Sequence, residues 1–213
     1  MSDRPLFESV EGLRGTGKST VAPMLAAARK AVLVPTVPVF YQSLRREIDL
    51  RDNVEARMSF YLSALFTAVD EIQRYLAAGI PVVVESYFAR CLANHHALGA
   101  RLGVTLPPDL PQPVTYLLFC TEKERLRRLA ERDKPISRWD VLGEDAAGRI
   151  TTAYALFPMH RVDTTGLEPE QVVQAILATD TQGAQRHADA EPVGAHPHLL
   201  PPVPLRAEGA HIP

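Results

Sequence analysis

The chain has 213 residues, enough for one α/β domain with a sizeable core but not for two comfortable domains. Lys and Arg total 23 against 25 Asp and Glu, so the formal net charge of −2 gives no support for a nucleic-acid partner. Two cysteines without a CxxC spacing argue against a disulfide framework or a structural zinc site. The first ten residues lack the apolar stretch of a signal peptide, and the apolar run at residues 80–84 is too short to span a bilayer. We therefore expect a soluble, cytoplasmic protein without membrane contact.

Apolar runs and helical patterns alternate along the chain, which predicts a parallel sheet with right-handed crossovers. The strands are expected at residues 6–10, 31–34, 80–84, 114–120 and 161–163. The helices are expected at residues 18–30, 40–48, 53–78, 89–102, 121–132, 140–156 and 168–178. After residue 180 the periodicity stops, and six prolines within residues 181–213 predict a mostly disordered tail. The expected organisation is one domain over residues 1–180 followed by this tail.

Between the first predicted strand and helix, residues 12–19 have the spacing G-x4-G-K-S of a phosphate-binding loop. Glycines let the backbone wrap its N–H groups around phosphate oxygens, and the following helix adds the positive end of its dipole. Lys18 is expected to reach the β- and γ-phosphates of ATP, and Ser19 to hold Mg²⁺. Thr20 fits a helix position better than the position of a second metal ligand. The nucleotide-binding residues predicted from this segment are Gly12, Arg14, Gly15, Thr16, Gly17, Lys18, Ser19 and Thr20.

The segments around this loop resemble the thymidylate kinase family, within the wider group of nucleoside and nucleotide kinases. Residues 11–20 look like that family's phosphate loop, residues 60–61 with 76–85 like its third-strand region, and residues 163–166 like its last loop. Residues 121–138 are similar to its arginine-bearing segment, with the lid itself at about 133–140. The resemblance covers roughly residues 6–178. It implies a P-loop NTPase fold with a parallel five-stranded sheet flanked by helices, and a homodimer paired through residues 53–78.

Three arginines that the family places around the acceptor monophosphate or the transferring group are missing here. Thr36-Val37-Pro38 lacks the arginine before the proline, Ala64 stands four residues after Phe60, and Glu85-Ser86-Tyr87 replaces an Asp-Arg-Tyr motif. Because a dianionic phosphate in a cleft needs charge-assisted partners, these losses argue against dTMP as the acceptor. They also leave open a decayed site that binds ATP without catalysis.

Two other arginines offer replacement charge. Arg14 stands where the family usually has an acid directed toward the acceptor sugar. It could compensate for the lost charge, act on the transferring phosphoryl group, or be an ordinary solvated loop residue. Arg90, on the predicted helix after Glu85, could swing back toward the site and bind the acceptor.

Glu85 ends a buried strand at its carboxyl edge, where ligands bind in open α/β sheets. An acid there can order Mg²⁺ or accept the proton of an attacking hydroxyl, and it can also cap the following helix. We therefore predict Ser19 and Glu85 as metal ligands. The predicted catalytic residues are Lys18, Glu85, Arg14 and Arg132.

Arg125, Arg128 and Arg132 share one face of a predicted helix, at spacing i, i+3 and i+7. With Arg138, the residues Arg128 and Arg132 are candidates to close over the triphosphate of ATP and exclude water. Arg125 and Arg127 are expected on a solvated helix face.

The acceptor is expected to meet an aromatic wall that includes Tyr41, Tyr61 and Tyr87. His95 and His96 point about 100° apart on a helix and cannot chelate one metal well. A position at the surface is expected for them, with contact of one of them to the acceptor as the alternative. Glu8 lies in the predicted central strand and needs a buried partner, for which an arginine behind the phosphate loop is the candidate.

These observations predict an ATP- and Mg²⁺-dependent kinase that transfers the γ-phosphoryl group to a small-molecule acceptor. The acceptor would offer a hydroxyl group and be nucleoside-like or a specialised metabolite. Thymidylate kinase activity proper and a non-catalytic ATP-binding module are the alternatives. A switch GTPase is disfavoured because the sequence contains no Asn-Lys-x-Asp guanine motif.

Overall fold

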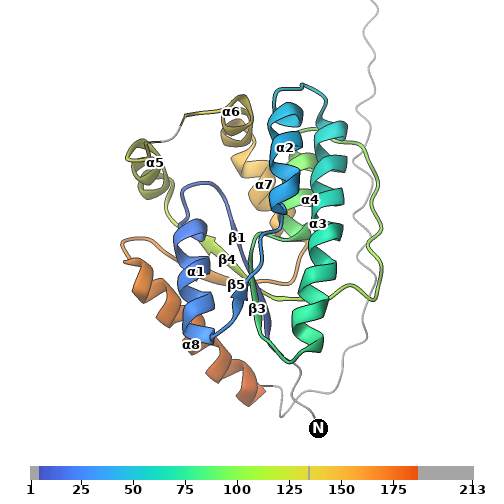
Figure 1. Cartoon of the computed structure of the whole chain (residues 1–213). Helices are drawn as coiled ribbons and strands as arrows, with labels where there is room; N and C mark the ends of the chain where they lie inside the picture. Colours follow the sequence, from blue (N-terminus) through green and yellow to red (C-terminus); the bar gives the residue numbers. More distant parts are fainter. Residues whose placement is uncertain (1–4, 134, 187–213) are drawn as a thin grey trace, which may run out of the picture.

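The computed structural model describes residues 5–133 and 135–186 (Figure 1). Its centre is a five-stranded sheet in the order β2-β3-β1-β4-β5, in which every neighbouring pair is parallel. The strands are β1 (Phe7–Gly12), β2 (Val32–Leu33), β3 (Val82–Glu85), β4 (Val114–Phe119) and β5 (His160–Asp163). The predicted parallel five-stranded sheet is confirmed.

The sheet is flanked by helices that follow the strands in alternation, as predicted. No helix within residues 5–133 and 135–186 is long and apolar enough to cross a membrane. A 3-10 turn, η1 (Val39–Tyr41), precedes α2. The helices are α1 (Lys18–Arg29), α2 (Gln42–Asp49), α3 (Val54–Ala77), α4 (Phe88–Ala97), α5 (Glu122–Ala130), α6 (Arg138–Asp145), α7 (Ala147–Tyr154) and α8 (Pro169–Arg186).

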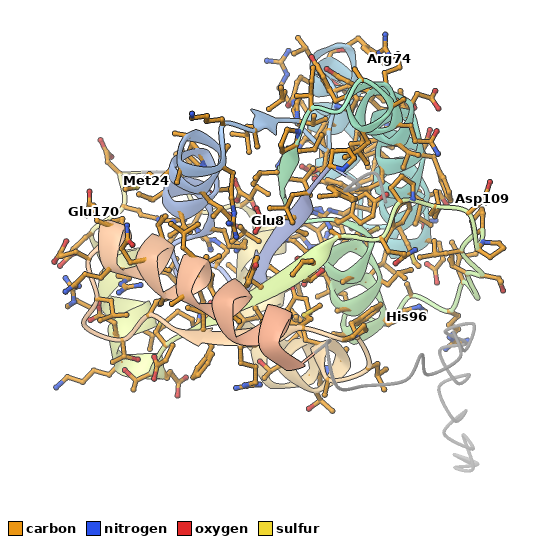
Figure 2. All side chains as sticks on the ribbon, turned by 90° about the horizontal axis from the view of Figure 1, so that it is seen from below. Glu8, Met24, Arg74, His96, Asp109 and Glu170 are labelled. Carbon is orange, nitrogen blue, oxygen red and sulfur yellow. The ribbon has the colours of Figure 1, made fainter. Side chains whose placement is uncertain are left out.

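The helices form a layer on each face of the sheet, because side chains of a strand alternate between its two faces. Val82 and Val84 join the core cluster that contains the apolar residues of α3 and α4, whereas Val83 joins the cluster of α1 and α8. Figure 2 shows Met24 of α1 on the same side of the sheet as Glu170 of α8. All three valines are fully buried, which explains why β3 is a continuous β-branched run.

Glu8 in the central strand has the arginine partner that its burial requires. Its side chain is fully buried and accepts hydrogen bonds from Arg29 Nε at 3.1 Å and Arg29 Nη2 at 3.0 Å. Tyr116 donates a third hydrogen bond to Glu8 Oε1 at 3.1 Å. Arg29 lies in the last turn of α1, behind the phosphate loop, so the predicted pairing with an arginine is confirmed. Paired and hydrogen-bonded, a carboxylate avoids most of the desolvation cost of burial.

The segment predicted as one helix at residues 140–156 is two helices, α6 and α7, joined at Ala146. Ser137 caps α6 with a capping box in which its hydroxyl accepts from Asp140 N and the Asp140 carboxylate accepts from Ser137 N. Gly143 and Gly148 lie on either side of the junction and weaken a continuous helix. The break lets α7 pack against α4 while α6 turns toward α2 (Figure 1).

Two further helix ends differ from the prediction. The helix predicted to reach residue 102 ends at Ala97, and Gly99 follows with φ of 98°. The last helix continues to Arg186 rather than ending at residue 178, so it includes the first residues of the predicted tail. The remainder of that tail, residues 187–213, lies outside the described residues.

Candidate functional site

The phosphate-binding loop connects the carboxyl end of β1, the middle strand of the sheet, to the N-terminus of α1. Gly12 and Gly15 have φ of 141° and 84°. A Cβ atom on Gly12 would lie 2.4 Å from the carbonyl oxygen of Leu118, and one on Gly15 would lie 2.9 Å from Cγ of Arg125. Neither position accepts a side chain, so these two glycines are required by backbone conformation and by space.

Lys18 and Thr16 hold the interior of the loop. Lys18 Nζ donates to the carbonyl oxygen of Leu13 at 2.8 Å, and Thr16 Oγ1 donates to the same oxygen at 2.9 Å. Burial, together with the positive charge of Arg90, lowers the pKa of Lys18 well below its ordinary value. An anion beside Nζ would favour the charged form of Lys18, which makes the loop interior receptive to phosphate.

The two predicted metal ligands come together at the carboxyl end of β3, beside the phosphate loop. Ser19, in the first turn of α1, donates from Oγ to Glu85 Oε1 at 2.8 Å, although the residues are 66 positions apart. Glu85 ends β3, and Ser86 after it has a left-handed φ of 68° that turns the chain into α4. A hydroxyl and a carboxylate are oxygen donors of the kind that Mg²⁺ binds together with nucleotide phosphates.

A cleft of ≈ 810 Å³ opens beside this pair and is called the main cleft below. It extends from the phosphate loop past the end of β3 to α3 and α4. The predicted site residues that line it are Arg14, Gly15, Gly17, Lys18, Ser19, Tyr61, Glu85, Tyr87, Arg90 and Arg132. Pro135, in the segment predicted as a lid, also lines it.

Other predicted site residues do not line the main cleft. Tyr41 packs on α3, where its hydroxyl lies 2.9 Å from Ser63 Oγ and 3.0 Å from Thr67 Oγ1. Arg138 pairs with Asp52, away from the cleft. Gly12 and Thr16 lie within the loop, and Thr20 is exposed on α1.

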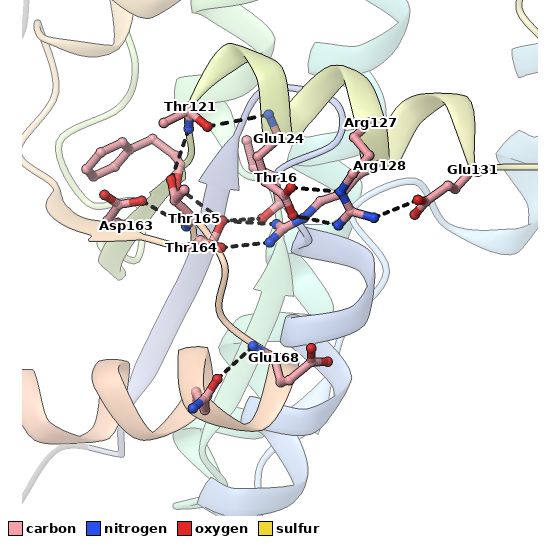
Figure 3. A network of polar contacts seen from close by, with 12 residues as sticks. Thr16, Thr121, Glu124, Arg127, Arg128, Glu131, Asp163, Thr164, Thr165 and Glu168 are labelled. Carbon is pink, nitrogen blue, oxygen red and sulfur yellow. Dashed lines mark hydrogen bonds and ion pairs between the residues drawn. The ribbon is translucent and has the colours of Figure 1, made fainter.

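Arg128 connects three segments behind the phosphate loop, as Figure 3 shows. Its Nη2 donates to the carbonyl oxygen of Thr164 at 2.7 Å, and its Nε donates to Glu124 at 2.8 Å. The Thr164 hydroxyl in turn lies 3.4 Å from the carbonyl oxygen of Thr16. Arg128 thus fixes the loop after β5 against α5 and the phosphate loop.

The remaining arginines of α5 differ from each other. Arg127 is 55% exposed and pairs with Glu124 and Glu131, as expected of a solvated face. Arg125 is only 5% exposed and pairs with Glu144 of α6, so the expectation of a solvated Arg125 is wrong. It is buried because its aliphatic part packs directly under Gly15.

Arg14 and Arg90 both reach the site. Arg14 Nε lies 3.2 Å from Asp140 Oδ1 at the start of α6, so its charge is paired across the cleft. Arg90 Nη1 donates to the carbonyl oxygen of Gly12 at 2.7 Å. One helical turn beyond Ser86, Arg90 therefore places a guanidinium group against the phosphate loop.

Glu11 is a residue of the site that the sequence analysis left without a role. It is fully buried, and its Oε1 accepts from Tyr87 N at 2.6 Å and from Ser9 Oγ at 3.2 Å. Its Oε2 has no hydrogen-bond partner among the described residues. Burial raises the pKa of Glu11 to about 7, against the smaller opposing effects of the Tyr87 amide, Arg90 and Lys18. Glu11 joins the strand before the phosphate loop to the turn that carries Glu85.

Arg57 of α3 is a second residue of the site that the sequence analysis missed. Its guanidinium carbon lies 4.7 Å from the ring centre of Tyr61 and 4.6 Å from that of Trp139 in α6. Its Nε donates to Asp49 Oδ1 at 2.9 Å. The only signal in the sequence was local, an Arg and a Tyr one helical turn apart, because Asp49 and Trp139 approach only in the fold.

His95 holds Arg57 from the α4 side. It is 3% exposed, so its expected place at the surface is wrong. Its Nδ1 lies 2.7 Å from the carbonyl oxygen of Cys91, which assigns the proton to Nδ1, and Nε2 accepts from Arg57 Nη1 at 3.0 Å. Burial and the charge of Arg57 lower the pKa of His95 to about 4, so the ring is neutral at pH 7.

A parallel sheet with a G-x4-G-K-S loop between its middle strand and the first helix defines the P-loop nucleotide-kinase fold. Among solved structures, the chain is similar to a thymidylate kinase from Candida albicans whose structure was described as revealing the origin of its broad substrate specificity. The TM-score is 0.70 with 18% sequence identity, over 86% of this chain and 94% of that one. No protein-family model matches the sequence, and no curated protein matches it.

Proposed function

We propose that this protein is an ATP- and Mg²⁺-dependent kinase that phosphorylates a hydroxyl group of a small acceptor, nucleoside-like or a specialised metabolite. One observation carries the proposal. The hydroxyl of Ser19 and the carboxylate of Glu85 meet at 2.8 Å beside the phosphate loop and next to a cleft large enough for an acceptor. The similarity to a thymidylate kinase supports a nucleotide-kinase fold but does not identify the acceptor.

Each residue of the loop side then has a role in this reaction. The backbone N–H groups of the phosphate loop and Lys18 bind the β- and γ-phosphates of ATP. Ser19 and Glu85 would hold Mg²⁺, which would supply positive charge to the transferring group, and Glu85 also orients the attacking hydroxyl. Arg132, which lines the cleft from the end of α5, covers the triphosphate.

The acceptor side supports an acceptor other than dTMP. The three positions where the thymidylate kinase family has arginines hold Val37, Ala64 and Ser86. The arginines that line the cleft instead are Arg45, Arg57 and Arg90, from α2, α3 and α4. Charge is thus present at different positions, which predicts a different orientation or a different chemical class of acceptor.

The test is an assay of ADP formation with the full chain, ATP and Mg²⁺, against nucleosides, dTMP and other small alcohols. Lys18→Ala should reduce turnover by about 10²- to 10³-fold, since it removes a charge aimed at the transition state. Lys123→Ala, an exposed lysine on α5, is the matched control and should leave turnover unchanged.

Three results would change the proposal in different ways. Robust turnover of dTMP would show that the acceptor class is wrong. Binding of ATP without transfer to any acceptor would favour a non-catalytic nucleotide-binding module. Full activity of Glu85→Gln would remove Glu85 from the reaction.

A further inference from the structure

A second, smaller cavity adjoins the main cleft and is called the side recess below. It has a volume of ≈ 280 Å³ and lies among α2, α3, α4, α6 and α7. The two cavities adjoin, because they share the lining residues Arg14, Arg45, Arg57, Arg90, Asn94 and Asp140. Lys18, Ser19 and Glu85 do not line the side recess, so a group held there is set apart from the reacting phosphoryl group.

The charged groups of the side recess do not balance. Five guanidinium groups and three carboxylates line it. Asp140 pairs with Arg14, and Glu144 pairs with Arg125. The third carboxylate, Asp49, is shared by Arg45 and Arg57, which leaves one positive charge in excess at that place. The fifth guanidinium group, that of Arg90, donates a hydrogen bond to the Gly12 carbonyl oxygen and lies near the buried carboxylate of Glu11.

Arg45 has unused hydrogen-bonding capacity. Its Nε donates to the Tyr61 hydroxyl at 3.1 Å and lies 3.5 Å from Asp49 Oδ2, which directs the guanidinium group toward the cavities. Its two Nη atoms donate no hydrogen bond within the described part of the chain. A planar guanidinium with a free edge is suited to bind a carboxylate or a phosphate with two parallel hydrogen bonds.

The Arg45 side chain is 45% exposed, whereas the neighbouring cation, Arg57, is held in place. Arg57 is fixed by Tyr61, Trp139, Asp49 and His95, and its side chain is only 14% exposed. Asn94, on the facing helix α4, has a buried Oδ1 without a hydrogen-bond partner among the described residues. A ligand that offers an anionic group to the arginines and a donor to this oxygen would satisfy both.

We propose that Arg45 and Arg57, with Asp49 between them, form a subsite for an anionic group of the acceptor that is distinct from the reacting hydroxyl. The acceptor class is then a small alcohol that also bears a carboxylate or a phosphate monoester. This inference rests on the proposed function in so far as it calls the ligand an acceptor. The binding of an anion at this subsite does not depend on catalysis.

The test uses Trp139, the only tryptophan of the chain, which lines the side recess and stacks on Arg57. Inorganic phosphate and, separately, acetate are titrated into the full chain carrying Lys18→Ala, which weakens competing binding at the phosphate loop. Trp139 fluorescence is followed. Arg45→Gln is compared with Arg46→Gln, the matched control, because Arg46 is exposed and lines neither cavity.

The proposal predicts a saturable fluorescence change that Arg46→Gln retains and that Arg45→Gln shifts to about tenfold higher anion concentration. Asp49→Asn should shift it to lower concentration, because it removes the competing carboxylate. A response to acetate alone would assign a carboxylate, and a response to phosphate alone a phosphate monoester. No saturable change with either anion, or equal affinity in Arg45→Gln and Arg46→Gln, would overturn the subsite.

A purely structural role for the cluster gives a different result. If Asp49 only connects α2 to α3, Asp49→Asn would lower the melting temperature and leave anion affinity unchanged or weaker. ATP binding to the chain with Lys18 intact is measured by calorimetry in parallel. Failure of the nucleotide site would appear there, and failure of phosphoryl transfer would appear in the assay of ADP formation. Failure of the anion subsite alone would appear in the fluorescence titration, with ATP binding unchanged.

Discussion

The two walls of the main cleft are built in different ways. The phosphate-loop wall comes from one stretch of eight residues. Its shape depends on glycine conformations, and its hydrogen-bond donors are mostly backbone N–H groups. The opposite wall is made of side chains from α2, α3, α4 and α6, whose residues are far apart in the sequence. Backbone-built sites can be recognised from a short motif, whereas side-chain-built sites depend on how helices pack.

The largest expected effect comes from the loop wall. Gly12→Ala puts a Cβ atom 2.4 Å from the Leu118 carbonyl oxygen at a φ of 141°, so the loop or β4 must shift. We expect a loss of several kcal/mol of unfolding free energy and loss of ATP binding. Chemical denaturation and calorimetry measure the two.

The control for that change is Gly148→Ala in α7, where a Cβ atom meets nothing within 4 Å. It should stabilise the chain by up to about 1 kcal/mol, because alanine is the better helix former. If Gly12→Ala still bound ATP normally, the loop wall would not depend on backbone geometry.

The second prediction concerns Glu11, which joins the two walls. Its pKa is raised by burial to about 7, so the folded state prefers the protonated form. The resulting stability is fully present below about pH 4.5 and is lost as pH rises to about 7, by up to about 3 kcal/mol. Glu11→Gln should remove this slope in the unfolding free energy between pH 4.5 and 7.

Urea denaturation at several pH values measures this dependence. Glu47→Gln, an exposed acid on α2, should leave the slope as it is in the wild type. An unchanged slope in Glu11→Gln would show that Glu11 titrates in its ordinary range despite its burial.

The third prediction tests the opposite wall of the cleft, which is built from side chains, without changing the phosphate loop. Arg57→Met removes the cation between Tyr61 and Trp139 and should lower kcat/KM for the acceptor by about 10- to 100-fold. The affinity for ATP should change less than about twofold, since Arg57 hydrogen-bonds to Asp49 and His95, which lie outside the phosphate loop. Steady-state kinetics with each substrate varied in turn measures both.

Arg74→Met is the matched control, because Arg74 is an exposed arginine on the same helix that does not line the main cleft. It should change neither parameter. An equal loss for ATP and acceptor in Arg57→Met would mean that the two walls are not separable.

The smallest expected effect is at an ion pair that bridges the two walls near the surface. Asp140→Asn breaks the ion pair with Arg14, in which each side chain is 27% exposed. The unfolding free energy should fall by less than about 1 kcal/mol, and the effect should shrink with added salt. Thermal denaturation at low and high ionic strength measures it, and a larger, salt-independent loss would indicate a buried role for this pair.

The predicted elements were confirmed where local pattern and tertiary structure agree. Val82 to Val84 is apolar at every position because both faces of β3 are covered, and Lys18 follows a loop whose three glycines all adopt positive φ. The prediction was wrong for Arg125 and His95, because charge and polarity alone indicated the surface. Arg125 is buried by packing under Gly15, and His95 by its hydrogen bonds to Cys91 and Arg57.

The sequence by itself determined the alternation of strands and helices, the phosphate-binding loop and the lack of the three family arginines at their usual positions. Only the tertiary structure decided that Ser19 meets Glu85, that Arg29 neutralises Glu8, and that Arg45 and Arg57 share Asp49. The physical reason is the distance along the chain over which each interaction acts. Backbone conformation and hydrophobic periodicity act between neighbours in the chain, whereas charge pairing acts between neighbours in space, which sequence separation does not reveal.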